Sequence, residues 1–555
     1  MRVSTNTIYD LGVSALQNRQ AELVKHQQQL STGRRILSPA DDPVSAARTL
    51  DLTQSTQLNE QYIENTDYAR GALSLAEGNM QQVIRVLQDV QTLAVNAGNP
   101  SLTLAEKKML DQELRGRYAE LIALGNSTDG NGQYLFSGFQ GSTQPFTELN
   151  FGSVTYNGDE GQRRVQISTG RQIPVSDSGA DLFFKIKDGN GTYATGMATP
   201  DLPNSITLKG GGSIVASRDW ASAYTASEFK IDFDGTNYTI TRLADNAQVT
   251  MDHAALQAGV LPGWGVRFVA VGPQPQALTT GRINPTVTKN VGTGVISTGV
   301  VTDPNKWADP NNVQAFRVQF HSVNDPNDPT GNRKLTRYDI IDNRPVLTNG
   351  SVNPNFNKSM IDGFDYTAGT PLGARDDTPG NPNTYPRLYK PGGDIELRQL
   401  PGENTPLVAN WDFGGKFDVS GVPADGDSFA IRPSVEHDIF STLGEFSTAL
   451  TSYQGTDDGM ATLQNRLNGV IANLNNSLGQ VLGNQSNIGA RLKEMDAVRN
   501  TNQDLNIQYK DSISRMNDLD YAKAITDFSL TQTYLDAARR SFAQVQNLSL
   551  FQYVQ

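Results

Sequence analysis

The sequence predicts an α+β protein in which long helices from both chain ends form an antiparallel coiled coil or helical bundle, with all-β outer domains inserted between them. Both ends carry apolar residues at heptad spacing, whereas about residues 140–434 consist of short alternating runs broken by Gly, Pro, Asn and Asp. Helix-type composition returns at about residue 435. Because a heptad stripe needs a partner helix to cover it, the two helical ends are expected to fold together.

The C-terminal stretch from about Asn484 to Gln555 is predicted to be the longest helical part. It holds no proline or cysteine, and Gly489 is its only glycine. Large apolar residues recur every seven positions, with small or β-branched residues three positions behind them: Tyr521, Phe528, Leu535 and Phe542, then Ala524, Thr531, Ala538 and Val545. A continuous helix here would run roughly 100 Å at 1.5 Å per residue. A rod of that length cannot bury its own stripe, so it requires a partner.

The N-terminal stretch, about Thr7 to Leu30, carries a second and thinner seam in which Gln20 and Gln27 occupy positions that apolar residues would fill. Such a helix is marginal alone and orders mainly against a partner. An ordinary intramolecular core is the alternative, which the Gln-filled seam disfavours. The predicted assembly interface therefore joins the seams of both ends: Tyr9, Val13, Leu16, Leu23, Leu30, Tyr521, Phe528, Leu535, Ala538, Phe542 and Val545.

Start and stop signals divide the N-terminal helical part. Gly33 is expected to end the first helix in a left-handed cap, and Asp42 with Pro43 is expected to begin the next long helix. Thr103 and Glu106 have the spacing of a capping box, which predicts the start of a further helix.

The middle of the chain predicts short antiparallel strands. Residues 134–138 are interpreted as a strand leaving the helical part, and residues 154–156 and 165–167 as a hairpin. Residues 229–233 and 238–240 alternate on either side of an Asp-Gly turn and predict a second hairpin. Many short strands at this spacing suggest sandwiches or barrels.

A weak internal duplication is a further hypothesis for the β-rich region. Residues 229–272 contain an alternating strand, a Tyr-Thr-Ile strand and a strand led by Trp, and residues 316–421 contain segments of the same order. Coincidence among β-rich segments is the alternative. Unlike topologies in the two segments would exclude the duplication.

Charge and composition disfavour several classes of protein. The formal net charge of −12 at pH 7 disfavours a nucleic-acid or anionic-membrane partner. No window holds an uninterrupted apolar run long enough to span a bilayer, and Met1 to Thr7 has no apolar h-region, so a cleaved secretory signal is not expected. The absence of cysteine removes disulfides, thiol catalysis and thiolate metal sites. It fits a cytosolic protein, or one that leaves the cell by a route other than a cleaved signal.

No catalytic, cofactor-binding or metal site is predicted. The histidines stand far apart in the sequence, at His26, His253, His321 and His437. Residues 325–329 suggest a cation loop, but the twelfth position is Thr336 rather than Glu, and a turn is the better interpretation. Helix capping explains Asp41 and Asp42 more simply than acid–base chemistry does, and residues 209–213 lack the Walker spacing of a phosphate-binding loop.

Several segments taken together resemble the bacterial flagellin superfamily. Residues 31–36 are similar to its N-terminal region, and Pro43 stands where filament flagellins usually have alanine. The segments that resemble its hook-associated branch are Asp41 to Arg48, Gly132 to Gly138, Gly421 to Phe429, Asp518 to Ala522 and Leu548 to Phe551. The helical likeness covers about the first 140 and the last 110 residues. The β insertion is longer than this branch leads us to expect.

The resemblance implies a structural, non-enzymatic subunit of the extracellular flagellum, exported unfolded through the flagellar type III channel. It implies a homo-oligomeric ring between hook-associated protein 1 and the flagellin filament, and an export chaperone that holds the C-terminal helix. Residues 1–35 and 519–555 would be terminal helices of an inner tube domain. Residues 36–139 and 435–518 would be the halves of a helical bundle, and residues 140–434 the outer β-rich domains. No cofactor is implied.

The thin seams also predict how such a subunit assembles. Ordering the backbone costs roughly 1–2 kcal/mol per residue, which a lone pair of seams does not offset. We therefore expect residues 1–35 and 519–555 to be disordered in the free subunit and to fold when neighbours arrive.

Two other functions stay open at the level of the sequence. Filament flagellin with a decorated outer domain is disfavoured by Pro43 and by residues 134–136. A secreted enzyme carried on the helical shaft would need converging acidic or histidine residues in the β insertion, and the sequence shows no such cluster.

Overall fold

The computed structural model describes both helical ends and much of the β-rich middle of the chain. The described residues are 5–198, 204–207, 213–218, 229–242, 247–257, 266–271, 279–283, 290–309, 315–325, 327–328, 330, 332–344, 353–355, 358–364, 387–403 and 406–551. Within them, helices occupy both ends and antiparallel strands occupy the middle, which confirms the predicted α+β class.

The helices of the described residues are mostly long. They are α1 (Thr5–Thr32), α2 (Pro43–Ala97), α3 (Leu104–Gly125), α7 (Ile439–Thr451), α8 (Asp457–Asn517) and α9 (Tyr521–Phe551), with the short α4 (Gly179–Phe183), α5 (His253–Gln257) and α6 (Pro304–Trp307).

The predicted helix signals act as expected. Gly33 has φ +67°, and its amide donates to the carbonyl four residues back at 2.8 Å, which ends α1. Before α2, Asp42 Oδ1 accepts from the Ser45 amide at 3.0 Å. Thr103 and Glu106 form both arms of a capping box at the start of α3. These three predictions are confirmed.

The C-terminal helical stretch differs from the continuous rod considered above. Helix α8 begins at Asp457, well before residue 484, and ends at Asn517, and α9 begins only at Tyr521. Asp520 accepts a hydrogen bond from the Lys523 amide at 3.1 Å, so its carboxylate caps a new helix. An N-cap signal inside a continuous heptad pattern is therefore what interrupts the rod.

Two strand predictions were wrong. Residues 134–138 form turns with two isolated bridges, Tyr134 to Thr128 and Ser137 to Ser178, because Gly138 at φ +71° bends the chain back. Residues 154–156 and 165–167 do not pair with each other. Each pairs across a two-residue turn with a nearer segment instead, and tight turns of this kind close at a lower entropic cost than the longer loop.

The strands next to the helical part form small antiparallel pairs. These pairs are β1 (Phe146–Asn150) with β2 (Ser153–Tyr156), β3 (Arg164–Ser168) with β4 (Arg171–Pro174), and β5 (Ile186–Lys187) with β22 (Glu436–His437).

Two larger groups of strands form the β insertion, here named the first and second β modules. The first is β7 (Asn204–Thr207), β8 (Ser213–Arg218), β9 (Phe229–Phe233), β10 (Asn237–Arg242), β11 (Gln248–Asp252), β12 (Val266–Val271) and β13 (Thr279–Ile283). The second is β6 (Tyr193–Ala198), β14 (Val295–Ile296), β15 (Val300–Val301), β16 (Phe316–Asn324), β17 (Lys334–Asp342), β18 (Arg387–Leu388), β19 (Asp394–Arg398), β20 (Asp412–Ser420) and β21 (Ser428–Pro433). The predicted hairpin of β9 with β10 is confirmed.

The two modules share a strand order. One sheet of the first module runs β11-β10-β9-β13, and the second module contains β18-β17-β16-β21, extended by β6. In the first module, the strand that precedes β13 in the chain is β12, which pairs with β8 in a separate sheet. In the second module, the strand that precedes β21 is β20, which pairs with β19 in a separate sheet. The like topology that a duplication requires is therefore present, although residues 258–265, which include the Trp of the first segment, lie outside the described residues.

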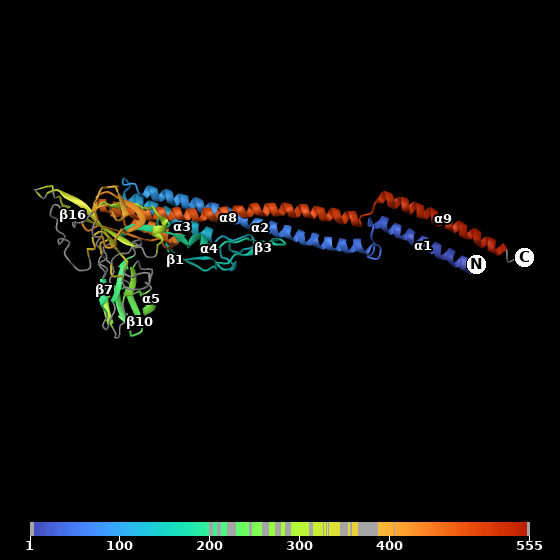
Figure 1. The fold of residues 1–555 in the computed structure, drawn as a ribbon, viewed down its shortest axis with the longest axis horizontal. Helices are drawn as coiled ribbons and strands as arrows, with labels where there is room; N and C mark the ends of the chain where they lie inside the picture. The colour runs from blue at the N-terminus through green and yellow to red at the C-terminus, as the bar shows by residue number, and fades with distance from the viewer. Residues whose placement is uncertain are drawn as a thin grey trace. The chain divides into compact units, whose positions relative to one another are not determined.

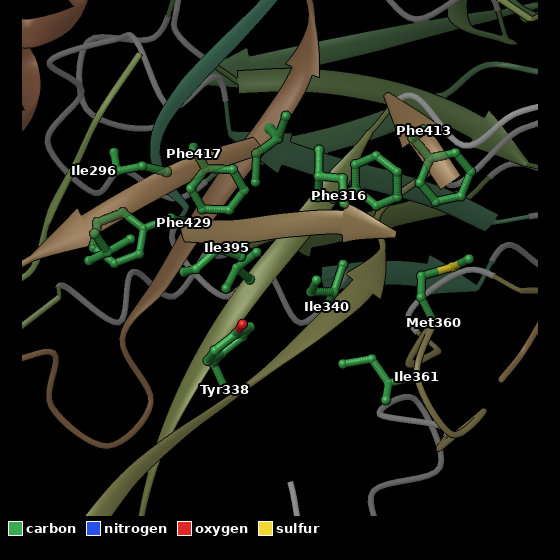
Figure 2. Close-up of a cluster of buried hydrophobic side chains, with 14 of the residues drawn as sticks. Ile296, Phe316, Tyr338, Ile340, Met360, Ile361, Ile395, Phe413, Phe417 and Phe429 are labelled. Atoms are coloured by element: carbon green, nitrogen blue, oxygen red, sulfur yellow. The ribbon is translucent and has the colours of Figure 1, made fainter. Parts of the chain in front are cut away.

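The second module has a continuous aromatic and aliphatic core (Figure 2). Alternate residues of β16, Phe316, Val318 and Phe320, are fully buried and meet Phe413 and Phe417 of β20. Each fully buried side chain of this size contributes roughly 1.5–3 kcal/mol. The module thus has a hydrophobic core of its own, as a separate domain would.

Chain contacts divide the molecule into two compact units. Unit 1 consists of Met1–Ser74, Arg164–Val175 and Gly489–Gln555, and unit 2 of Leu75–Arg163 and Ser176–Ile488. The domain ranges predicted from the sequence follow chain order, whereas both units collect segments from the two helical halves. The two ends of the chain therefore belong to a single compact unit.

A close approach of two glycines in unit 2 gives a testable prediction. A Cβ on Gly444 of α7 would lie 2.7 Å from the Cα of Gly152. We expect Gly444→Ala to lower the free energy of unfolding by roughly 1–3 kcal/mol, because backbone must move to admit the methyl group. Gly479→Ala in α8 is the matched control, since a Cβ there meets nothing within 4 Å. Gly479→Ala should raise the free energy of unfolding by up to about 1 kcal/mol, because alanine has a higher helix propensity than glycine. Equal effects in urea unfolding would contradict the close approach.

Candidate assembly surface

The two terminal helices of unit 1 lie antiparallel to each other (Figure 1). The rings of Tyr9 and Phe542 are 5.4 Å apart, and the Arg19 guanidinium lies 5.8 Å from the ring centroid of Tyr534. Gly12 makes the approach possible, because a Cβ there would come within 2.8 Å of the Phe542 ring. The seams predicted at the two ends thus face each other.

The pair buries its seam incompletely. Leu535 is 4% exposed, and the small seam residues Ala524 and Thr531 are also buried. Tyr9 and Tyr521 remain 50% and 53% exposed. The other predicted interface residues whose side chains are described are half-buried: Val13, Leu16, Leu23, Leu30, Phe528, Ala538 and Phe542. The side chain of Val545 lies outside the described part of the chain.

Apolar side chains outside the seam extend the candidate surface, and the heptad reading missed them. Ile525 is 54% and Leu530 45% exposed on α9, and Leu11 and Val24 are exposed on α1. At about 100° per residue, Ile525 and Leu530 point roughly 140° apart around α9. These two residues, named here the flank residues, leave α9 apolar on two separate sides. The sequence signal that could have found the flank residues is that they are apolar residues at helix positions outside the heptad seam.

The break between α1 and α2 is joined to the break between α8 and α9. The Arg35 amide donates to Asn517 O at 2.7 Å, and the Leu519 amide donates to Gly33 O at 3.0 Å. The Arg35 side chain adds bonds of 3.1 and 2.7 Å from Nε and Nη2 to Met516 O, at the end of α8. The two interruptions therefore form one hydrogen-bonded joint at the base of the terminal pair.

Asp41 supports this joint from the α1–α2 connection. Its carboxylate accepts from the Lys25 ammonium at 2.6 Å and from the amides of Leu37 and Ser38 at 3.1 and 2.9 Å. These bonds, that of Lys25 foremost, lower the pKa of Asp41 to about 2. The role of Asp41 is thus a local brace, and Asp42 is the helix cap.

Acid is expected to loosen this brace. Because the folded-state pKa of Asp41 lies below the value of about 3.9 for an unfolded chain, its stabilising effect is present above pH 4 and is lost as pH falls toward 2. The Leu37 and Ser38 amides should lose protection from hydrogen exchange over this window. Asp41→Asn should show the same low protection at every pH, and unchanged protection of the parent at pH 2 would contradict the brace.

Next to the joint, polar contacts link α2 and α8 within unit 1. Asn59 Nδ2 donates to Asn502 O, and the Arg499 and Lys510 side chains pair with carboxylates of α2 at 2.7 and 2.9 Å. The β3–β4 hairpin is attached by a two-bond ion pair between Arg171 and Glu494. Exposed pairs of this kind contribute roughly 0–1 kcal/mol each, so they set register more than stability.

The described residues hold neither a metal-binding group nor a membrane-spanning helix. Among them, no group of three or more His, Asp or Glu residues is placed to hold a metal ion. No helix in the described ranges is long and apolar enough to cross a membrane. The histidines stay apart: His26 contacts Gln29, His253 contacts Tyr238, and His437 contacts Ser441.

Two family models match the chain. The bacterial flagellin N-terminal helical region matches residues 3–141, and the D2-like domain of flagellar hook-associated protein 1 matches residues 203–277, most of the first β module.

Curated relatives match mainly through part of their length. Flagellar hook-associated protein 3 of Salmonella typhimurium is 36% identical over 186 residues, which are 34% of this chain and 58% of the relative. The same protein of Escherichia coli is 33% identical over an equal share. Flagellin A of Helicobacter felis is 29% identical over 31% of this chain and 34% of the relative. The chain thus spans a little over half of the hook-associated protein 3 sequences.

Solved structures share the fold. Flagellar hook-associated protein 3 from Legionella pneumophila aligns with a TM-score of 0.54 at 21% identity, covering 84% of this chain and 98% of that one. The flagellar junction protein FlgL from the same organism aligns with a TM-score of 0.53 at 21% identity, covering 85% of this chain and 100% of that one. The chain is thus similar to flagellar hook-associated protein 3 in sequence over part of its length and in fold, and its residues 3–141 match the bacterial flagellin N-terminal helical region.

Proposed function

We propose that this protein is a structural adapter of the bacterial flagellum, located at the junction between hook and filament, and that it assembles through its terminal helices. The observation that carries the proposal is the half-buried antiparallel pair of α1 and α9. Likeness to hook-associated protein 3 in sequence supports the place in the flagellum. The adapter is extracellular, serves motility, and has no catalytic role.

The exposed parts of α9 support assembly with further copies of the chain. Two helices cover only one side of each other, so Tyr9 and Tyr521 at the seam and the flank residues Ile525 and Leu530 still contact water. Neighbouring copies on either side of α9 would cover both flanks. A homo-oligomeric ring supplies such neighbours, because each subunit in a ring has two.

Assembly completes a coiled coil that the single chain only begins. In this proposal the predicted interface residues line the contact between α1 and α9, and helices of neighbouring subunits pack against the positions that are half-buried in the single chain. Burial of the flanks would then offset the ordering entropy of residues 1–35 and 519–555. The free subunit is expected to have weakly protected ends that become protected in the assembly.

The partners follow from the adapter role. Hook-associated protein 1 lies on one side of the ring and flagellin on the other. An export chaperone covers the C-terminal helix until the subunit leaves through the type III channel.

A deletion strain tests the adapter role against that of filament flagellin. If the protein is the adapter, cells without it export flagellin into the medium but hold no filaments, and the intact gene restores filaments. If it is the filament subunit, no flagellin pool appears in the medium.

Limited proteolysis of the purified chain tests the assembly mechanism. Trimming from both ends to a stable middle supports it, and a resistant full-length chain that does not associate contradicts it.

A further inference from the structure

One side of α8 carries a row of side-chain amides that bind the backbone of the β insertion. The row, named here the amide ladder, consists of Asn465, Asn468, Asn473, Asn476 and Gln480. At about 100° per residue, these positions fall within an arc of roughly 140° around the helix. All of its contacts lie within unit 2.

Asn465 and Asn468, the first two residues of the amide ladder, hydrogen-bond to the backbone of strand β14 as a neighbouring strand would. Asn465 accepts from the Ile296 amide at 2.8 Å and donates to Gly294 O at 2.9 Å. Asn468 donates to Ile296 O at 3.0 Å. The other edge of β14 pairs with β20. The two amides therefore satisfy an edge strand that would otherwise expose its backbone groups.

The remaining rungs bind the chain where it enters the second β module. Asn473 accepts from the Gly189 amide at 3.0 Å, and Asn476 donates to Lys187 O and Gly189 O at 2.6 and 2.9 Å. Gln480 extends the row to the short helix α4, where it donates to a backbone carbonyl at 2.8 Å.

The entering chain is tied to the chain that leaves the module. Asp188 Oδ1 accepts from the Val435 amide at 2.8 Å, and its other oxygen pairs with Arg432. The amide ladder thus holds both the segment that enters the second β module and the segment that leaves it, because the two segments are bonded to each other at Asp188.

The contacts named above between the ladder and the module are hydrogen bonds, and they lie next to a cavity. This cavity of about 80 Å³ is lined by Asp188, Arg432, Asn465 and Asn473 among others. A water needs roughly 10–15 Å³ of such volume and two to four polar partners, so the cavity has room and partners for several. The hydrophobic core of the module lies among its own strands (Figure 2). Separation at the ladder would leave that core intact.

We propose that the amide ladder is a latch, which fixes the orientation of the second β module on α8 and releases it as one folded body. Side-chain amides can exchange backbone partners for water, whereas a dry core cannot part without a large loss of burial. Because Asn465 and Asn468 hold the module and Asn473 and Asn476 hold the chain that enters it, loss of one of these contacts weakens the others. This inference is independent of the place of the protein in the flagellum.

Hydrogen exchange of the full-length chain tests the cooperative release. Asn465→Ala removes the acceptor of the Ile296 amide, and a latch predicts faster exchange at the remote Gly189 amide as well, by about tenfold. The amides of Val318 and Phe320 in the module core should keep their rates. The matched control is Asn487→Ala, at an exposed position of α8 that makes the same change in helix propensity.

Two outcomes would overturn the latch. Faster exchange confined to Ile296 would mean independent local bonds, and faster exchange at Val318 would mean that the ladder belongs to the module core.

Spin labels give a second readout, because the chain has no cysteine of its own. Labels at Ser486→Cys on α8 and Lys390→Cys in the module should give one narrow distance distribution in the parent. Asn465→Ala should broaden it, and an unchanged distribution would also overturn the proposal.

Discussion

A Leu530→Lys variant is expected to keep the weak pairing of α1 with α9 that the free subunit has but no longer to assemble, whereas Leu535→Lys is expected to lose this pairing as well. Leu530 is 45% exposed on a flank, and Leu535 is 4% exposed in the seam. A lysine at Leu535 loses a buried aliphatic side chain and desolvates an ammonium, which costs roughly 2–5 kcal/mol. A lysine at Leu530 changes the monomer by only about 0.5 kcal/mol.

The two variants separate folding of the pair from assembly. Far-UV circular dichroism and hydrogen exchange of residues 5–32 report the pairing, and sedimentation reports association. Leu530→Lys should lower association at least about tenfold, the equivalent of 1.4 kcal/mol, because a charge would be buried against a neighbour. Gln532→Lys adds the same charge at an exposed polar position of α9 and should assemble. Assembly of Leu530→Lys at the parental level would show that the flank is not an interface.

The seam could be predicted from the sequence because its physical cause is local. Residues seven apart on a helix share a face, so the spacing of Tyr521, Phe528 and Leu535 defines a stripe before any partner is known. The partner helix is expected at the other end of the chain, because both ends of the sequence carry a helical heptad pattern. The flank residues have no such repeat. Ile525 and Leu530 look like ordinary surface positions until the paired structure shows that nothing in the single chain covers them.

The β insertion was harder to predict because its pairing depends on competition between partners. The alternation in residues 154–156 and 165–167 is compatible with the predicted hairpin, but each segment has a partner closer in sequence. The amide ladder was not predicted at all. Asparagine is a poor helix former and common at turns, so its positions on α8 carry no signal without the backbone that they bind. In contrast, the shared strand order of the modules gives the hypothesis of duplication support that sequence alone did not.

Replacement of Lys107 is expected to cause the largest loss of stability from a single charged residue in unit 2. Lys107 is fully buried in the first turns of α3, and its Nζ donates to Ala97 O at 2.8 Å and Asn99 O at 3.3 Å. The ammonium also lies 4.7 Å from the ring centroid of Tyr453. It therefore binds the Ala97 carbonyl at the end of α2, which has no partner within its own helix, and the Asn99 carbonyl just beyond the helix, which also accepts from the Leu102 amide at 3.3 Å. Burial lowers the pKa of Lys107, which reflects the cost of holding the charge there.

Lys107→Met keeps most of the aliphatic stem but leaves the Ala97 carbonyl without the donor that Lys107 supplies, so the free energy of unfolding should fall by roughly 2–4 kcal/mol. Lys107→Ala should cost more, because a cavity is added. The neighbouring Lys108 is exposed, and Lys108→Met should stay within about 0.5 kcal/mol of the parent. Urea unfolding followed by circular dichroism measures all three. A methionine tolerated equally well at both positions would mean that packing of the stem, and not the ammonium, holds the end of α2 against α3.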